Sequence, residues 1–332
     1  MKAMVLEGIN QPLVLQDVAD LQPGENEVVV ALSAAALNHR DVWIQKGQYA
    51  GLKFPIILGS DGAGVVAQVG SAVSRNWLGK EVIINPGMDW GDNLRAQTRQ
   101  FKIIGLPDNG TFAQAVKAPA ENLFEKPAHL SFEQAATLPL GGVTAYRSLI
   151  TRGQLKAGER VLITGVGGGV AVLAFQFAVA TGAQVYVTSG SDAKLERAKQ
   201  LGAVGGANYR AEDWDKQLRA QVDGFDVIVD SAGGEGFSKF LELAAPGGRI
   251  ICFGATLGSP KSFDLRRIFW KQLDLCGSTM GTPEDFARMV ELVEAKRIQP
   301  VVDKVFPLAD AQAAMDRMSA AEQFGKIVLS IA

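Results

Sequence analysis

The stretch Val161-Leu162-Ile163-Thr164-Gly165-Val166-Gly167-Gly168-Gly169-Val170-Ala171 decides the fold of this chain. An apolar run of β-type residues, Val161 to Ile163, enters a glycine cluster, and an apolar segment of helical composition, Val170 to Thr181, leaves it. A strand, a tight glycine turn and a helix together form the geometry that cradles a dinucleotide pyrophosphate.

Two glycines of this turn have a predicted physical role. Gly165 allows the sharp turn, and Gly168 leaves room for a phosphate to approach the backbone. The helix N-terminus, at Gly169 and Val170, offers N–H groups and the positive end of the helix dipole to the phosphates. A glycine turn that is only structural, in some other α/β protein, is the alternative reading.

Further β-type runs follow the turn at regular intervals. They are Gln184–Thr188, Phe225–Asp230 and Gly248–Gly254, with segments of helical composition between them. Such β–α alternation predicts a parallel, doubly wound sheet. Residues 1–124 differ, because short apolar runs there are broken by Gly, Pro and Asn, which favours a small β-rich barrel-like domain.

The composition limits the possible functions. The 332 residues suffice for about two domains. With 47% apolar residues, 20% charged residues and a net charge of −2, the chain has ample core and lacks the basic stripe typical of nucleic-acid binding. The first residues lack the apolar run of a signal peptide, and no uncharged apolar stretch reaches membrane-spanning length, so a soluble cytoplasmic protein with no membrane partner is expected.

Polar residues cluster between the apolar runs of the first domain. Asn38-His39-Arg40-Asp41 is followed by Gly47-Gln48-Tyr49 and by Gly59-Ser60-Asp61-Gly62-Ala63-Gly64. This clustering indicates the lip of a site, although two ordinary loops would give the same pattern.

These segments carry a resemblance to a known family. The chain resembles a medium-chain dehydrogenase/reductase, the superfamily of zinc alcohol dehydrogenases and zeta-crystallin-like quinone oxidoreductases. The resemblance implies an α/β fold, with a Rossmann doubly wound parallel sheet at residues 125–297 and a β-rich GroES-like barrel catalytic domain at residues 1–124 and 298–332. It rests on the opening Met1–Val5, on Asn38–Asp41, on Gly59–Gly64, on the glycine turn, on Asp230–Gly234 and on Gly325–Leu329.

The positions that hold zinc in zinc-containing members differ here. The cysteine ligand of those members corresponds to Asn38, the histidine ligand to Ser60, and the third ligand falls near Leu140. Leucine cannot coordinate zinc, and neutral Asn and Ser are poor ligands for it. The region of the four-cysteine structural zinc lobe, residues 85–105, contains no cysteine. The chain is therefore similar to the zinc-free, quinone-oxidoreductase-like branch, and no metal is expected.

The end of the second strand predicts which cofactor is used. NAD-preferring folds place a carboxylate there, whereas this chain has Ser189. A 2′-phosphate needs donors and positive charge, so NADPH is predicted. In quinone-oxidoreductase relatives the positions matching Lys194 and Tyr209 flank that phosphate. Asp192 either caps the following helix or touches the ribose, and the second role would weaken the preference for NADPH.

Other positions are expected at the cofactor or at a subunit contact. Gly254 and Ala255 follow the fourth strand, where the ligand crevice of such sheets lies. In the family, the residue matching Thr144 lies near the nicotinamide; a plain helix residue is the alternative. Lys326 either reaches the cofactor cleft or is a solvated lysine at a strand end. The edge strand around Leu273–Met280 pairs with its partner subunit in the family, which implies a homodimer.

A metal-free site must stabilise the charge that hydride transfer creates. The candidate donors are the Asn38 amide, Arg40 and Tyr49, which would act as an oxyanion hole. Quinones and α,β-unsaturated carbonyls suit such a site because conjugation spreads the charge. Tyr49 or water would donate the proton, and Asp41 would orient Arg40 or cap its turn. Two alternatives stay open: a zinc-independent alcohol or aldehyde oxidoreductase, and a non-catalytic NADPH-binding protein.

Overall fold

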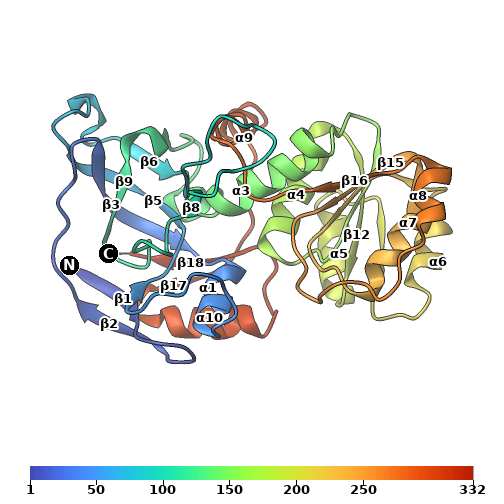
Figure 1. Ribbon diagram of the computed structural model, residues 1–332, viewed down its shortest axis with the longest axis horizontal. Helices are drawn as coiled ribbons and strands as arrows, with labels where there is room; N and C mark the ends of the chain where they lie inside the picture. The colour runs from blue at the N-terminus through green and yellow to red at the C-terminus, as the bar shows by residue number, and fades with distance from the viewer. Residues whose placement is uncertain (332) are drawn as a thin grey trace. The chain divides into compact units, whose positions relative to one another are not determined.

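The computed structural model describes residues 1–331, which form two compact units. Unit 1 comprises Met1–Gly142 together with the described residues from Thr282 onward, and unit 2 comprises Val143–Gly281. The boundary falls inside helix α3, Pro139–Tyr146, which continues into the π-helix η3, Arg147–Arg152 (Figure 1). Among the described residues no helix is both long enough and apolar enough to cross a membrane.

Unit 2 contains one parallel six-stranded sheet in the order β13-β12-β11-β14-β15-β16. Counted along the chain, this is the order 3-2-1-4-5-6 of the Rossmann fold. The predicted doubly wound sheet is therefore confirmed. The strands are β11 Arg160–Ile163, β12 Gln184–Ser189, β13 Gly205–Asn208, β14 Phe225–Asp230, β15 Ala244–Cys252 and β16 Asp274–Gly277.

The central strands of this sheet are apolar because both of their faces are buried. Val161, Leu162 and Ile163 of β11 are almost completely buried, as parallel strands between helical layers require. The helices of unit 2 are α4 Gly169–Thr181, α5 Asp192–Gln200, α6 Trp214–Arg219, α7 Phe240–Leu243 and α8 Leu265–Lys271, with a 3₁₀ turn η4 at Glu235–Lys239.

Unit 1 is built on a mainly antiparallel sheet in the order β10-β6-β5-β3-β18-β17, with β9 also paired to β3. A three-stranded sheet, β2-β1-β4, and a two-stranded sheet, β7-β8, complete this unit, which is β-rich as predicted. Its strands are β1 Lys2–Leu6, β2 Leu13–Asp17, β3 Glu27–Ala36, β4 Ile56–Ile57, β5 Asp61–Val69, β6 Glu81–Ile84, β7 Gly87–Met88, β8 Lys102–Ile103, β9 Ala115–Pro119, β10 Leu123–Glu125, β17 Val302–Pro307 and β18 Lys326–Ser330.

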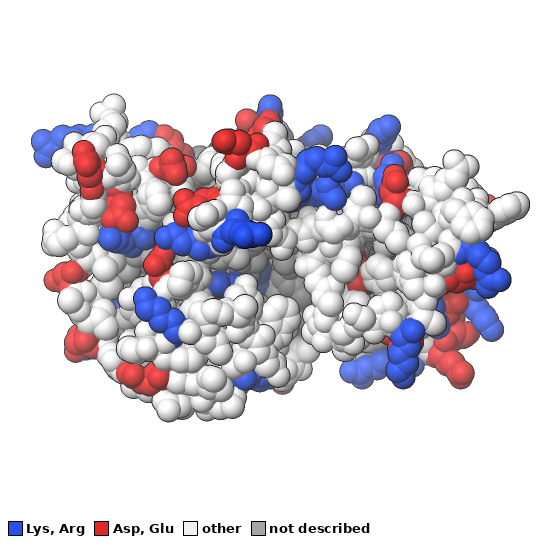
Figure 2. Space-filling view, viewed as in Figure 1, with Lys and Arg blue, Asp and Glu red and all other residues white. Residues whose placement is uncertain are grey.

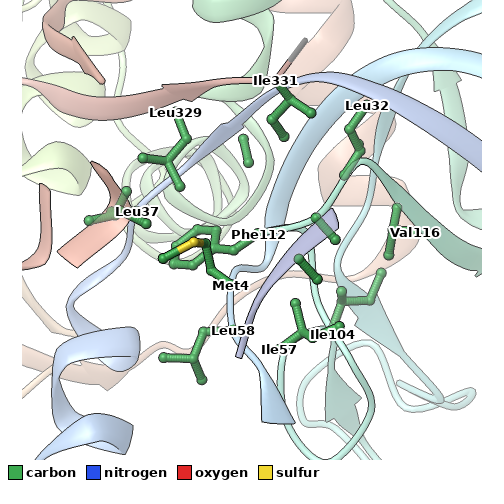
Figure 3. Close-up of a cluster of buried hydrophobic side chains, with 14 of the residues drawn as sticks. Met4, Leu32, Leu37, Ile57, Leu58, Ile104, Phe112, Val116, Leu329 and Ile331 are labelled. Carbon is green, nitrogen blue, oxygen red and sulfur yellow. The ribbon is translucent and has the colours of Figure 1, made fainter. Parts of the chain in front are cut away.

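The core of unit 1 joins segments that are far apart in the chain. Met4, Leu37, Leu58, Phe112 and Leu329 are buried in one cluster, although they come from five separate segments (Figure 3). Leu37 and Leu58 directly precede the two polar segments, beginning at Asn38 and Gly59, that were predicted to form the lip of a site. The apolar core therefore fixes where those polar segments begin.

The helices of unit 1 explain why the predicted domain boundaries, 124/125 and 297/298, differ from the two compact units. Helix α9 packs within unit 1, where the rings of Phe124 and Phe286 lie 4.7 Å apart. The helices of this unit are α1 His39–Gln45, α2 Phe132–Ala136, α9 Pro283–Ala295 and α10 Ala311–Ser319, with 3₁₀ turns η1 Arg75–Trp77, η2 Ala120–Asn122 and η5 Leu308–Asp310. On the visible face of each unit, positive and negative side chains are interspersed (Figure 2).

Candidate functional site

The glycine turn of unit 2 has the conformation that its sequence predicts. Gly165 and Gly167 have φ angles of 66° and 127°, in the region that favours glycine. The turn is tied to the neighbouring strand, because the Val166 N–H donates to the Thr188 carbonyl at 2.7 Å. Helix α4 follows with Gly168 as its N-cap, so the first N–H groups of this helix have no intrahelical acceptor.

The space beside the turn is open. A Cβ placed on Gly165 would meet no atom within 4 Å, and one placed on Gly168 would meet only the Gly165 carbonyl oxygen, at 3.7 Å. The protein itself therefore leaves room for a side chain at position 168. Gly169 and Val170, in the first turn of α4, are partly exposed, and an anion approaching their N–H groups would find this space open, so the turn fits a dinucleotide pyrophosphate.

Hydroxyl groups and a cation lie at the end of β12. Ser189 is buried, and its hydroxyl donates to the Val166 carbonyl at 3.0 Å, which joins the strand end to the glycine turn. The side chains of Tyr209 and Arg210 lie over Gly190, where an added Cβ would be 2.7 Å from the Tyr209 hydroxyl and 3.0 Å from Arg210 Nε. Sequence reasoning selected Tyr209 but did not assign a role to Arg210.

The predicted capping role of Asp192 is wrong. Helix α5 begins at Asp192 itself, so the cap position belongs to Ser191. The Asp192 carboxylate accepts a hydrogen bond from the Asn208 amide at 2.8 Å instead. Lys194 lies in the same helix and is half-buried. The end of β12, where a ribose-binding carboxylate would stand, is thus Ser189, and the Asp192 carboxylate that follows in the chain is bound to the Asn208 side chain.

Three other residues predicted to bind the cofactor lie in unit 2, where Thr144 is buried, Gly254 is half-buried and Ala255 is exposed. The hydroxyl of Thr144 contacts the sulfur of Met280 at 3.9 Å, and Thr144 is buried in α3. Gly254 and Ala255 follow β15, and a Cβ on Gly254 would lie 2.8 Å from the Ser231 carbonyl oxygen. Gly254 therefore allows close approach of two loops. Nucleotide contacts for all three stay a prediction.

Sequence reasoning missed the role of Asp230, the last residue of β14. Its carboxylate accepts hydrogen bonds from the Thr164 hydroxyl at 2.5 Å and from the Gly233 N–H at 2.8 Å. Burial is the largest influence on its pKa and raises it. Asp230 thus joins the loop after β14 to the residue that begins the glycine turn. The signal was present in the sequence, because an acid at the end of an apolar strand precedes two glycines.

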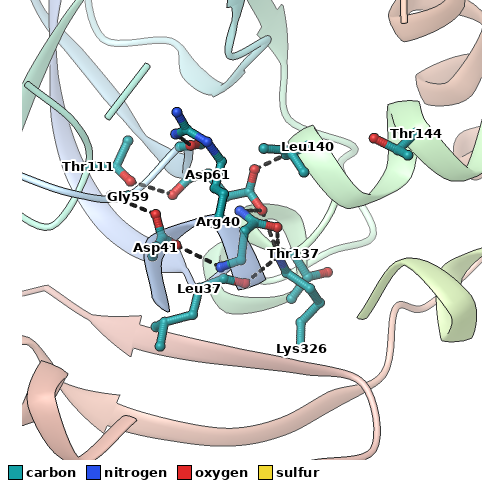
Figure 4. A network of polar contacts seen from close by, with 12 residues as sticks. Leu37, Arg40, Asp41, Gly59, Asp61, Thr111, Thr137, Leu140, Thr144 and Lys326 are labelled. Carbon is teal, nitrogen blue, oxygen red and sulfur yellow. Dashed lines mark hydrogen bonds and ion pairs between the residues drawn. The ribbon is translucent and has the colours of Figure 1, made fainter. Parts of the chain in front are cut away.

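In unit 1 the predicted site residues form a buried polar network (Figure 4). Asp61, at the start of β5, is its centre and is fully buried. One carboxylate oxygen accepts from the Leu140 N–H at 2.7 Å. The other accepts from the Asn38 side-chain amide at 3.0 Å and from the Lys326 ammonium at 2.8 Å.

Arg40 and Tyr49 form a second group beside this network. The Arg40 guanidinium is buried and donates to the Ser60 hydroxyl at 2.6 Å and to the Ile104 carbonyl at 2.9 Å. It also lies 5.1 Å from the centre of the half-buried Tyr49 ring. Arg40 therefore clamps two loops together, and only its Nε is buried without a hydrogen-bond partner. A contact of Arg40 with a substrate stays a prediction.

Asp41 caps helix α1, as one of its two predicted roles required. Its carboxylate accepts from the Asn38 backbone N–H at 2.7 Å and, more distantly, from the Gly59 N–H at 3.4 Å. Burial raises the pKa of Asp41 to about 6, against the opposing effects of the Arg40 charge and the Asn38 N–H. The carboxyl group therefore changes charge close to neutral pH.

The residues at the expected zinc positions do not fit zinc. The Asn38 oxygen already accepts from Lys326 at 2.7 Å, and the Ser60 hydroxyl lies between Arg40 and the Ile104 carbonyl. Leu140 contributes only its backbone N–H, which is a donor. Within residues 1–331 there is no cluster of three or more His, Cys, Asp or Glu side chains that could hold a metal ion.

Lys326 is not a solvated lysine at a strand end, which was one of its two predicted roles. It is 3% exposed, and its three hydrogen bonds, to Leu37, Asn38 and Asp61, lie within unit 1. Because an ammonium group has three donors, none remains for a nucleotide. A direct cofactor contact by Lys326 thus has no support in this geometry.

Two family descriptions match parts of the chain. Residues 24–128 match the family described as an alcohol dehydrogenase GroES-like domain, and residues 169–295 match the family described as a zinc-binding dehydrogenase. The first range lies in unit 1, and the second runs through unit 2 from helix α4 onward and ends with helix α9 of unit 1.

Individual relatives match over nearly the whole chain. A zinc-type alcohol dehydrogenase-like protein YogA of Leptosphaeria maculans is 36% identical over 96% of this chain and 95% of its own length. A solved structure titled NAD-dependent alcohol dehydrogenase is 38% identical, with a TM-score of 0.94 and full coverage of both chains. The 2-octenoyl-CoA carboxylase reductase CinF, solved with NADP and 2-octenoyl-CoA, is 26% identical, with a TM-score of 0.88, 99% coverage of this chain and 87% of its own.

Proposed function

This chain belongs to the medium-chain dehydrogenase/reductase superfamily, and we propose that it is an NADPH-dependent reductase of quinones or α,β-unsaturated carbonyls that works without a catalytic metal. Its oxidoreductase character follows from the family. The single observation that carries the proposal is the donor set of unit 1, in which an amide, an ammonium and a guanidinium stand at and around the positions that hold zinc in zinc-containing members.

The preference for NADPH is supported by the end of β12. A carboxylate there would bind the ribose 2′-hydroxyl and repel a 2′-phosphate, but this chain has Ser189. Tyr209 and Arg210 lie together over Gly190 and bring a hydroxyl donor and a positive charge. Asp192, three residues after Ser189 in the chain, is bound to Asn208. The two nucleotides named among the related structures, NAD and NADP, do not decide between them.

When bound, NADPH supplies the hydride. The chain's own residues must then stabilise negative charge on the acceptor oxygen and provide a proton. The Asn38 amide has a second N–H beyond the one that binds Asp61, and Tyr49 brings a half-buried phenol. Neutral donors of this kind act as an oxyanion hole, and a conjugated acceptor needs less stabilisation than an isolated carbonyl because its charge is delocalised.

The test is NADPH oxidation by metal-stripped protein with an ortho-quinone, an enone and a saturated aldehyde offered side by side, and with NADH as the alternative reductant. We expect turnover of the quinone or enone, a lower rate with NADH, and no gain when zinc is added. Activity that appears only with zinc would refute the metal-free mechanism.

A second candidate, a zinc-independent alcohol or aldehyde oxidoreductase, is favoured by the alcohol dehydrogenase names of the relatives. The same assay separates the two, because this candidate predicts faster turnover of the saturated aldehyde than of the enone. Tight binding of NADPH with no turnover of any acceptor would instead favour a non-catalytic NADPH-binding protein.

We also propose a homodimer formed through strand β16. This strand is the last of its sheet and carries Leu275, which is 41% exposed. On the nearby helix α8, Phe269 and Trp270 are 66% and 84% exposed. Pairing with a second copy would cover the open strand edge. Light scattering after gel filtration should give twice the chain mass, and Leu275→Lys should shift the protein toward the monomer.

A further inference from the structure

The ammonium group of Lys326 is held inside unit 1 by oxygen atoms. Its Nζ lies 2.6 Å from the Leu37 carbonyl oxygen, 2.7 Å from the Asn38 side-chain oxygen and 2.8 Å from an Asp61 carboxylate oxygen. These three acceptors use all three N–H donors of the group. The cation is thus coordinated by the protein much as a metal ion is, by oxygens from three residues.

The carboxylate of Asp61 depends on this cation. The Asp61 side chain is completely buried, with an exposure of 0%, and Lys326 is its ion-pair partner at 2.8 Å. The Leu140 N–H and the Asn38 amide supply its other hydrogen bonds. A buried carboxylate that lost its cation would remain charged without compensation, which is strongly unfavourable.

The same contacts fix the orientation of the Asn38 side chain. Lys326 only donates hydrogen bonds and the Asp61 carboxylate only accepts them, so the amide oxygen must face Lys326 and the amide nitrogen must face Asp61. A flipped amide would place its NH₂ group against the Lys326 ammonium and its oxygen against the Asp61 carboxylate. The remaining N–H of the Asn38 amide is therefore held in one direction.

We propose that the Lys326 ammonium takes the place of a metal ion in unit 1: it balances the charge of Asp61, positions the Asn38 amide, and excludes a divalent cation. At the positions that hold zinc in zinc-containing members, Asn38 is bound to Lys326 and Ser60 to Arg40, so a Zn²⁺ ion would meet one cation in the Asp61 network and a second in the group beside it. Lys326 is a positioning residue, because it acts through Asn38. Its effect on turnover rests on the proposed reductase function, whereas its effect on metal binding does not.

The first experiment compares Lys326→Ala with the matched control Lys304→Ala, which alters an exposed lysine on the neighbouring strand β17. For Lys326→Ala we expect kcat for the conjugated acceptor to fall roughly 100-fold, the loss typical of an oxyanion-hole donor that is no longer in place. The Kd for NADPH, from fluorescence titration, should stay unchanged, because Lys326 has no donor left for a nucleotide. Ethylammonium should restore part of kcat, while tetramethylammonium, which has no N–H, should not.

Three results would overturn the positioning role. They are an unchanged kcat, a loss that is confined to the NADPH Kd, and a loss that ethylammonium does not relieve. Should Lys326→Ala fail to fold, the double variant Lys326→Met with Asp61→Leu removes both charges and leaves no unpaired carboxylate. Its kcat should fall in the same way with an unchanged NADPH Kd, and an active double variant would contradict the proposal.

The second experiment needs no turnover and so remains decisive if the reductase proposal fails. Metal-stripped wild-type protein is dialysed against Zn²⁺ and its metal content is measured beside that of Asp61→Asn. We expect neither protein to retain zinc in a one-to-one ratio. Stoichiometric zinc in the wild type that disappears in Asp61→Asn would show that the metal displaces the ammonium, and would overturn the inference.

Discussion

The buried carboxyl group of Asp41 should make the stability of the protein fall as the pH rises toward neutrality. Its pKa is raised from 3.8 to about 6 in the folded protein, chiefly because burial disfavours the charged form. The folded state therefore holds a proton that the unfolded state has already released between these two pH values. Raising the pH through this window must remove the proton from the folded state, which lowers the free energy of unfolding.

The size of the effect follows from the shift. A difference of roughly two pKa units corresponds to about 3 kcal/mol in total. Because the lower end of the window lies close to the unfolded pKa, an experiment from about pH 4.5 to about pH 7 samples about 2 kcal/mol of it. Replacement by Asn keeps an acceptor for the Asn38 N–H and removes the titration.

The assay is urea unfolding of the wild type and of Asp41→Asn, followed by circular dichroism at several pH values across this range. Subtracting the Asp41→Asn curve removes the contributions of all other titrating groups. The free energy of unfolding of the wild type should fall relative to the variant as the pH rises. A difference that stays flat, or that grows in favour of the wild type with rising pH, would refute the account of Asp41 as a buried acid with a raised pKa.

Three further predictions concern other parts of the chain. Gly165→Ala forces a side chain into the left-handed region at φ 66° and should destabilise the protein by about 1 kcal/mol in thermal unfolding, with weaker NADPH binding. Tyr209→Phe should weaken NADPH binding about tenfold, as expected for a lost hydrogen bond to a charged group, and leave NADH binding unchanged in the same titration. Arg40→Met removes the donor to the Ser60 hydroxyl and one of the two donors to the Ile104 carbonyl, which keeps its bond from Ser60, and should cost about 2 kcal/mol of stability, measured by urea unfolding.

Local features of the fold could be predicted from the sequence. The glycine turn is made by consecutive residues, and its positive φ angles follow directly from Gly165 and Gly167. Strands rich in β-branched residues, such as Phe225–Asp230, could also be predicted from their own sequence. Strand β13 was missed because Gly205–Asn208 reads Gly-Gly-Ala-Asn, which has no strand propensity of its own. Its pairing with β12 is what makes it a strand.

The polar network of unit 1 could be predicted only as a set of residue types. Its members come from four distant segments, near positions 38, 61, 140 and 326, and only the folded barrel brings them together. The residues next to Lys326 in the sequence therefore gave no indication of its contacts. Following Gly325 at a strand end, it suggested solvent or a ligand, while its true partners lie more than 260 residues earlier in the chain.

The presence of the Lys326–Asp61 pair in the barrel calls for an explanation other than stability. A buried ion pair often stabilises a protein no more than well-packed apolar residues of the same size would, because both charges must first lose their hydration. The surrounding core is rich in Leu, Ile, Val and Ala, so an apolar pair would have been compatible with it. What an apolar pair could not do is hold the Asn38 amide in one orientation, since that requires a donor on one side and an acceptor on the other. The charged pair is therefore better explained by the direction it gives to Asn38 than by the folding energy it contributes.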